Sequence, residues 1–223
     1  MESDYFYRRN LPHYQPPNAS YFITFRLAGS LPHKIINNLI SLYKNKEILL
    51  KDIKDPVERR KKTYILKKKY FGTFDKFLDS SNCGPMWLQE DKIAAIMCDA
   101  IKYRDNKLYE LICYCIMPNH VHLVIRIEED EKGIQNSLKS EEKDLYRITK
   151  ILQRLKEYTA HEANIILRRK GQFWHRENYD HVIRNDKEFG NIVNYVLMNP
   201  VKAGLVKEWT DWKWSYYKEL EIE

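Results

Sequence analysis

The chain has little cysteine, glycine or proline, and it has no long apolar run. Its four cysteines form no CxxC pair and are too sparse for a disulfide scaffold, so a reducing compartment is expected. Seven glycines and eight prolines exclude a collagen-like or low-complexity chain. No apolar stretch approaches the roughly 20 residues that cross a bilayer, and the acidic, polar N-terminus lacks the apolar core of a secretory signal. We therefore expect a cytoplasmic protein with no membrane partner.

The residues that are present favour one folded core. Apolar residues make up 43% of the 223 positions and aromatic residues 13%, which excludes an intrinsically disordered protein. The length does not require two domains, and no linker or internal repeat divides the chain. We expect a single domain over residues 1–223.

The net charge of +7 comes from one segment. Residues 44–70 contain 11 Lys and Arg against 4 Asp and Glu, an excess equal to the net charge of the whole chain. Such a segment favours a polyanionic partner, because Lys and Arg release condensed counterions from phosphates. A solvated helix face without a partner explains the charge equally well at this point.

Hydrophobic periodicity divides the chain into alternating strands and helices. Strands are predicted at residues 21–27, 108–116, 120–127 and 173–183. A first helix is predicted to start at Ser30-Leu31-Pro32, with Ser30 as its cap and an apolar stripe at 35–43. Helices are further predicted through the basic segment, with a break at Asp55-Pro56, and at 90–103, 145–167 and 186–199, whereas 128–143 is a charged loop. Only Met117-Pro118-Asn119 separates the second and third strands, which predicts a β-hairpin. The pattern indicates a layered α+β fold with a basic helical insertion at about 44–80.

Two histidines lie on the second strand of this hairpin. Strand alternation places His120 and His122 on one face and the apolar Val121 and Leu123 on the other. Two neutral imidazoles side by side are suitable ligands for one divalent metal. A third alternating histidine, as in a histidine-triad hydrolase, is absent because Val124 occupies its position. The alternative is a pair of structural strand histidines.

The last predicted helix carries a phenol and an amide on one edge. Asn185 and Glu188 form a capping box at its start, and an apolar stripe follows at helical spacing. Tyr195 and Asn199 are four residues apart and therefore stack beside that stripe, and Pro200 is expected to end the helix. Tyr195 is a candidate nucleophile and the Asn199 amide oxygen a candidate hard ligand. The alternative is a core-edge tyrosine with Asn199 as a C-cap.

Together these motifs resemble a known family. Residues 117–124 (MPNHVHLV) are similar to the signature of HUH single-tyrosine transposases, and residues 194–206 (NYVLMNPVKAGLV) resemble the second block of the REP-associated tyrosine transposases. Residues 173–184 are similar to that subfamily's link into the tyrosine helix, residues 8–14 and 20–27 to its opening, and residues 212–216 to its tail. The resemblance covers most of the chain except about 44–80.

The resemblance implies a ferredoxin-like (RRM-like) fold and a DNA strand transferase. The implied activity is metal-dependent cleavage and rejoining of single-stranded DNA at hairpin-flanked sites, in the bacterial cytosol or nucleoid, by a monomer or homodimer. By carry-over, His120 and His122 bind Mg²⁺ or Mn²⁺, and Tyr195 is the nucleophile that forms a 5′-phosphotyrosine. Asn199 takes the third-ligand position, which related insertion-sequence transposases fill with Gln.

A basic groove for the DNA strand is a further expectation. Its candidate residues are Arg26, Arg126, Arg176, Arg184 and Lys202, each of which could equally be a solvated charge. The basic segment is expected to contact phosphates of the hairpin stem without reading bases. Tyr179 is a rival nucleophile, but it has no amide four residues on.

Two other functions stay open at the level of sequence. One is an HUH nickase of the replication-initiator kind, although the GxxxxGK[ST] loop of an attached helicase is absent. The other is a non-catalytic, hairpin-binding regulator derived from a transposase, which would bind DNA without metal dependence and without a covalent adduct.

Overall fold

Two units make up the computed structural model, which describes residues 6–8, 12–14, 16, 18–80, 84–128 and 147–218. Contacts group Met1–Leu27 with Met86–Glu223, which we call the sheet unit, and set apart Ala28–Pro85, which we call the helical unit. The predicted basic insertion at 44–80 falls within the helical unit. The prediction of a single domain stays a prediction.

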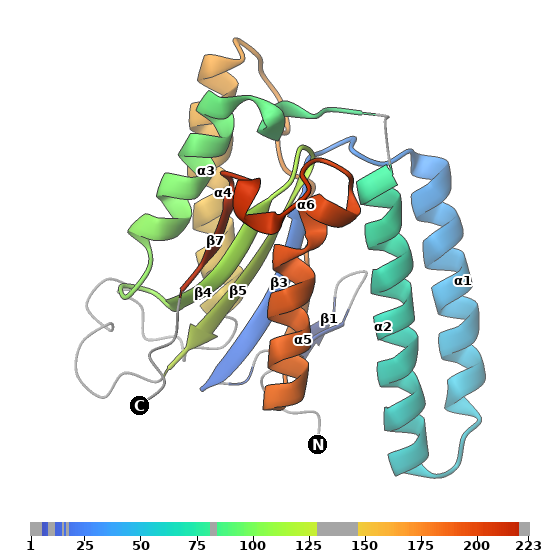
Figure 1. Ribbon diagram of the computed structural model, residues 1–223. Coiled ribbons are helices and arrows are strands. Elements are labelled where there is room, and N and C mark those ends of the chain that lie inside the picture. Colours follow the sequence, from blue (N-terminus) through green and yellow to red (C-terminus); the bar gives the residue numbers. More distant parts are fainter. Residues whose placement is uncertain are drawn as a thin grey trace, which may run out of the picture. The chain divides into compact units, whose positions relative to one another are not determined.

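A five-stranded antiparallel sheet is the centre of the sheet unit (Figure 1). Its order is β6-β3-β5-β4-β7, formed by β3 (Ala19–Arg26), β4 (Glu110–Ile116), β5 (His120–Ile127), β6 (Tyr179–Ile183) and β7 (Ser215–Tyr217). A separate pair joins β1 (Phe6–Arg8) to β2 (Pro12–Tyr14). The predicted hairpin is confirmed as β4 and β5, whose register shifts between Leu111 and Cys113. The α+β class, with an antiparallel sheet packed by helices, is likewise confirmed.

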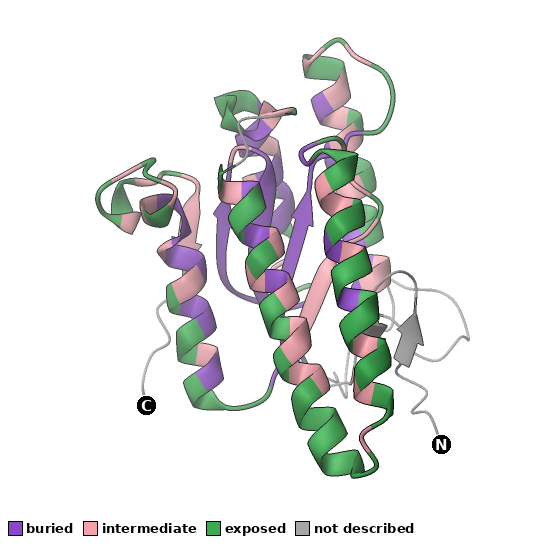
Figure 2. Cartoon of the chain, turned by 90° about the vertical axis from the view of Figure 1, so that its right-hand side faces the viewer, coloured by how far each residue is buried: buried purple, intermediate pink, exposed green. Residues whose placement is uncertain are grey.

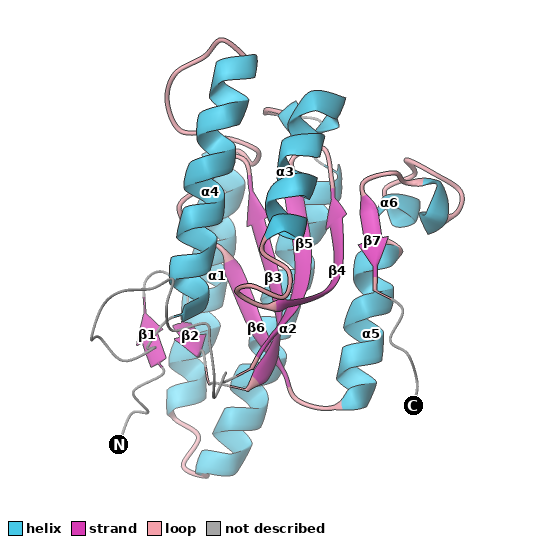
Figure 3. Ribbon diagram, turned by 90° about the vertical axis from the view of Figure 1, so that its left-hand side faces the viewer, coloured by secondary structure: helices cyan, strands magenta, loops and turns pink. Residues whose placement is uncertain are grey.

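One face of the sheet is the hydrophobic core. The apolar positions predicted on β5 all lie in it: Val121, Leu123, Ile125 and Ile127. Helices α3 (Asp91–Tyr103) and α4 (Arg147–Ile166) supply the other side of this core. Both helices lie in front of the sheet in Figure 3. The apolar side chains at every second position of the strand therefore pack against the apolar stripes of the two helices.

The other face of the sheet is more polar. Cross-strand register places Thr24 opposite His122 and Arg26 opposite His120, so these four side chains share that face. Helix α5 (Asp186–Leu197) packs against β4 and β5, and the short α6 (Asn199–Lys202) follows it. The short turns η1 (Trp87–Gln89) and η3 (Trp209–Asp211) complete the elements of the unit.

The helical unit is a pair of helices, α1 (His33–Lys51) and α2 (Pro56–Ser80), which pack on each other. The break predicted at Asp55-Pro56 is confirmed, and the Asp55 carboxylate accepts from the backbone N–H of Val57 at 2.9 Å. Tyr43 and Tyr70 meet with ring centroids 5.0 Å apart. On the two helices themselves few residues are buried, namely Leu39, Tyr43, Phe71, Asp75 and Leu78, and Figure 2 shows long exposed stretches on both helices.

One predicted strand was too long. The strand predicted at 173–183 begins only at Tyr179. Before it, Trp174 forms an isolated bridge with Leu27, and the backbone N–H of His175 donates to the carbonyl of Arg26 at 2.8 Å. The imidazole of His175 then accepts from the backbone N–H of Glu177 at 3.2 Å. This local turn interrupts the pairing of the segment with β3.

Two predicted helix boundaries were also wrong. Helix α1 begins at His33 after Pro32, and Ser30 is not its cap. The last helix, α5, ends at Leu197, two residues before the predicted end at Asn199, and Pro200 does not stop the helical path, because Met198 keeps a helical conformation and Pro200 sits in the first turn of α6. Proline is tolerated there because its fixed φ suits a helix and the missing N–H lies in the first turn.

The predicted helix at 145–167 is confirmed as α4, and the helix at 90–103 as α3. The charged loop predicted at 128–143 lies outside the described residues except for Glu128. Residues 9–11 of the opening motif and Cys83 lie outside them as well. Among the helices described, none combines the length and apolar character that a bilayer crossing requires.

Candidate active site on the polar face of the sheet

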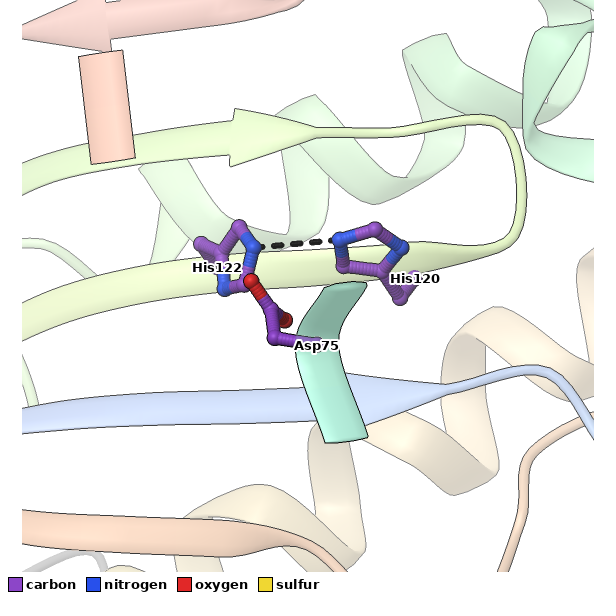
Figure 4. Close-up of side chains that lie close together, drawn as sticks. All are labelled: Asp75, His120 and His122. Atoms are coloured by element: carbon purple, nitrogen blue, oxygen red, sulfur yellow. Dashed lines mark hydrogen bonds between the residues drawn. The ribbon is translucent and has the colours of Figure 1, made fainter. Parts of the chain in front are cut away.

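The two predicted histidines converge at the start of β5. Both are fully buried, and their Nε2 atoms lie 3.0 Å apart (Figure 4). The rings meet edge to face, with centroids 4.6 Å apart. Figure 4 also labels Asp75, which belongs to the helical unit. Within the sheet unit, alternation on one rigid strand is enough to bring the two imidazoles together.

Each imidazole is held through its other nitrogen. His120 Nδ1 lies 2.6 Å from the Asn119 side-chain oxygen, and His122 Nδ1 lies 2.8 Å from the Thr24 hydroxyl. An amide oxygen only accepts, so His120 Nδ1 carries the proton and its Nε2 presents a lone pair. Such outer partners fix the tautomer and orientation of metal-binding histidines. Sequence reasoning missed both Asn119 and Thr24, although Asn119 directly precedes His120.

Both imidazoles are neutral at physiological pH. Burial lowers the pKa of His120 to about 3. Burial is also the main reason that the pKa of His122 lies well below its usual value, and the charges of His120 and Lys202 lower it further. Neutral imidazole is the form that binds a metal ion.

Tyr195 reaches the histidine pair from α5. The predicted N-cap of this helix is confirmed, because the backbone N–H of Glu188 donates to the Asn185 side-chain oxygen at 2.9 Å. The Glu188 carboxylate reaches back to the backbone N–H of Arg184, at 3.1 Å. The half-buried Tyr195 ring lies edge-on to His122, with centroids 5.7 Å apart, and contacts Phe22 of β3 at 6.0 Å. A phenol is therefore beside one of the two imidazoles.

Asn199 lies one helical turn beyond Tyr195. Its side chain is fully buried, and among the described residues neither carboxamide atom has a hydrogen-bond partner. A buried, unpaired amide is costly, so such a group indicates an unmet ligand or a strain. Its oxygen is the hard donor that Mg²⁺ and related cations prefer.

The donor set of the sheet unit fits a divalent cation. Adjacent ligands of an octahedral ion with bonds of about 2.1 Å are separated by about 3.0 Å. The two Nε2 atoms show this separation, 3.0 Å, and both rings are neutral. The buried Asn199 amide oxygen has no hydrogen-bond partner among the described residues, and its role as a third ligand stays a prediction.

Comparisons with known proteins find REP-associated tyrosine transposases among the proteins similar to this chain. The chain is 29% identical over 117 residues to a Haemophilus influenzae protein named as a REP-associated tyrosine transposase, and 23% identical over 117 residues to a REP-associated tyrosine transposase of Escherichia coli K12. It is also similar to a solved REP-associated tyrosine transposase bound to a REP hairpin, with a TM-score of 0.52 and 17% identity over 94% of this chain and 80% of that one. The chain resembles the REP-associated tyrosine transposases. This confirms the resemblance seen in the motifs.

The likeness has a limited extent. The matched residues are 52% of this chain and span 63% and 59% of the two curated relatives. No protein-family model matches the chain. At 17% identity, the likeness to the solved transposase concerns the fold.

The cations predicted to form a groove do not all gather at this transposase-like site. Lys202 lies over the Tyr195 ring, and Arg26 is buried opposite His120. Arg126 is at the far end of β5, where it pairs with Glu110 at 3.2 Å. Arg176 and Arg184 are exposed on either side of β6.

The rival tyrosine is also on the polar face. Tyr179 of β6 contacts Phe22, with ring centroids 6.1 Å apart, and stacks beside His181 at 6.4 Å. The His181 imidazole is bound to the buried Glu188 carboxylate at 3.2 Å. Phe22 thus contacts the rings of both Tyr179 and Tyr195, whereas His122 contacts that of Tyr195. This favours Tyr195 as the residue of the transposase motif.

Proposed function

We propose that this chain is a metal-dependent single-stranded DNA transposase, in which Tyr195 cleaves and rejoins DNA at hairpin-flanked sites. The observation that carries the proposal is the ring of Tyr195 beside His122, one of two buried, neutral and convergent imidazoles. The resemblance to REP-associated tyrosine transposases supports the same activity, and the hairpin bound by the solved relative suggests the substrate class.

His120, His122 and Asn199 are the residues that would hold a divalent ion, Mg²⁺ or Mn²⁺. When bound, such an ion acts as a Lewis acid that polarises and orients the scissile phosphodiester. The protein's own contribution is to fix these donors, through Asn119 and Thr24 for the imidazoles and through burial for the amide.

Tyr195 performs the covalent step. Its phenolic oxygen attacks phosphorus, a P–O bond to tyrosine forms, and the bond from phosphorus to the 3′ oxygen breaks. The phenol loses its proton to solvent or a nearby base, and the departing 3′ oxygen takes up a proton to become a 3′-OH. The product is a 5′-phosphotyrosine, which keeps the phosphodiester energy. A 3′-OH of a second strand can then reverse the step without ATP.

A covalent-adduct assay tests the proposal. Purified protein is incubated with labelled single-stranded hairpin DNA from the region flanking its gene, with Mn²⁺ or EDTA, and is resolved on a denaturing gel. We expect a Mn²⁺-dependent protein–DNA band that is lost in Tyr195→Phe.

Tyr179→Phe is the matched control, since it removes a second phenol from the same face and should keep the band. Loss of the band in Tyr179→Phe, with Tyr195→Phe unaffected, would reverse the assignment. Complexes on native gels without any covalent band would favour a non-catalytic hairpin-binding protein.

A further inference from the structure

Lys202 shares a helical stripe with the two site residues of the last helix. Tyr195, Asn199 and Lys202 are at positions i, i+4 and i+7, which lie on one side of a continuous helix. The helical path continues through the junction, because the N–H of Met198 donates to Asn194 at 2.9 Å and that of Lys202 to Met198 at 3.0 Å. The three side chains therefore project from one side of α5 and α6.

The backbone after Lys202 fixes this position. The N–H of Leu205 donates to the carbonyl of Pro200 at 2.9 Å, and Gly204 takes a φ of +70°. A reversed, left-handed residue with such a bond is the Schellman ending of a helix, and glycine adopts it without steric cost. Lys202 is thus held in the last turn of α6 rather than on a loose loop.

The ammonium group of Lys202 lies at the reaction centre. Its Nζ is 4.4 Å from the centroid of the Tyr195 ring. The Tyr195 ring in turn lies edge-on to His122, with ring centroids 5.7 Å apart. Lys202 is exposed, so a ligand from solvent can reach it.

A phosphodiester at this place would gain from a cationic side chain of the protein in addition to the proposed divalent ion. A phosphodiester carries one negative charge, and charge rises on its oxygens as the tyrosine attacks. An ammonium above the nucleophile's ring is placed to bind one of these oxygens, because lysine acts on phosphate as a compact point charge.

We propose that Lys202 binds a non-bridging oxygen of the scissile phosphate and holds the phosphorus for attack by Tyr195. The inference deepens the proposed function and rests on it. The cation–π contact keeps the ammonium over the ring before substrate arrives, so little side-chain reorganisation is needed on binding.

The first test is the single-turnover rate of adduct formation. Lys202→Met keeps the aliphatic stem over the ring but removes the charge, and we expect a loss of about 100-fold, the size typical for one lost donor to a developing oxyanion. Lys202→Arg should recover most of the rate. Lys207→Met is the matched control, because it removes another exposed lysine five residues on and should leave the rate unchanged.

The second test separates phosphate binding from ring packing. In a Tyr195→Phe background, which keeps a ring under Nζ and prevents cleavage, affinity is measured for a DNA strand with a normal scissile phosphate and for its two methylphosphonate stereoisomers. We expect Lys202→Met to weaken binding of the normal strand and of one stereoisomer, and to leave the other unaffected. The unaffected stereoisomer is the one whose methyl group replaces the oxygen that Lys202 binds. The double-mutant cycle of Lys202→Met and this methylphosphonate therefore measures the interaction between the lysine and that oxygen.

Two results would overturn the inference. Equal weakening for all three strands would mean that Lys202 only packs on the ring, and an unchanged adduct rate in Lys202→Met would mean that it has no part in the reaction. Absence of any adduct with the wild-type chain defeats the proposed function as well, whereas a wild-type adduct with an unaffected Lys202→Met defeats this inference alone.

Discussion

The sheet unit and the helical unit differ in how they carry polar groups. On the polar face of the sheet, the histidines and Asn199 are buried and neutral, and the imidazoles are fixed by neighbours at 2.6–2.8 Å. On α2, the cations are mostly exposed and gather in a run of lysines and arginines over a few buried residues. The sheet unit therefore holds a few side chains in fixed positions, whereas the helical unit presents many positive charges to solvent. We expect the sheet unit to determine the reaction and the helical unit to contribute affinity.

The largest expected effect comes from breaking the geometry of the sheet unit. His120→Ala removes one of two convergent nitrogens together with the contact of that ring to the Asn119 side chain. We expect adduct formation to fall by about 10³-fold, because several kcal/mol of charge stabilisation depend on the ion. The readout is the single-turnover rate across a Mn²⁺ titration.

His161→Ala is the control for this change, since His161 is an exposed imidazole on α4, away from the polar face of the sheet. Its rate and Mn²⁺ dependence should match the wild-type chain. Equal activity of His120→Ala and His161→Ala would show that the histidine pair is structural.

The comparison also explains which features the sequence could predict. Local rules were sufficient for the histidine pair, because strand alternation needs only His120, Val121 and His122 in order. They were sufficient for α5 as well, because Asn185 and Glu188 cap it by themselves. Both predictions depend on residues within one turn or one strand.

Features that depend on distant residues were missed. Thr24 is 98 residues from His122, and its role appears only once the register of β3 on β5 is known. The stripe that includes Lys202 was hidden by the expectation that Pro200 ends the helix. A local feature was missed as well: the strand predicted from residue 173 failed because the His175 side chain accepts from the backbone N–H of Glu177, which apolar periodicity does not reveal.

A smaller effect is expected from the charge of the helical unit. Arg60, Lys61 and Lys69 are exposed on α2, and changing all three to Gln should weaken binding of a hairpin DNA with a duplex stem. If each contacts a phosphate, the slope of log affinity against log salt should become shallower by about 2.7, at about 0.9 per contact. Binding is measured from low to moderate salt. Cleavage of a short strand without a stem should keep its rate.

The matched control removes three charges from the sheet unit instead. Lys92, Lys107 and Lys170 are exposed on or beside α3 and α4, and their replacement by Gln lowers the net charge by the same amount. A similar change of slope in both variants would mean that net charge alone acts, and that the basic run on α2 has no special contact with DNA.

The smallest effect is expected from the support of His122 by Thr24. Thr24→Val keeps the shape of the side chain but removes the hydroxyl that lies 2.8 Å from His122 Nδ1. We expect the Mn²⁺ concentration for half-maximal adduct formation to rise by about tenfold, since loss of a partner to a metal-binding histidine costs about 10–100-fold in metal affinity. The rate at saturating Mn²⁺ should change little, because the imidazole itself is still present.

Thr24→Ser, which keeps the hydroxyl, should behave as the wild-type chain does. Equal Mn²⁺ requirements in the Val and Ser variants would show that strand packing alone orients His122, and the distinction between a precisely fixed sheet unit and a charge-based helical unit would be weaker than the hydrogen bonds indicate.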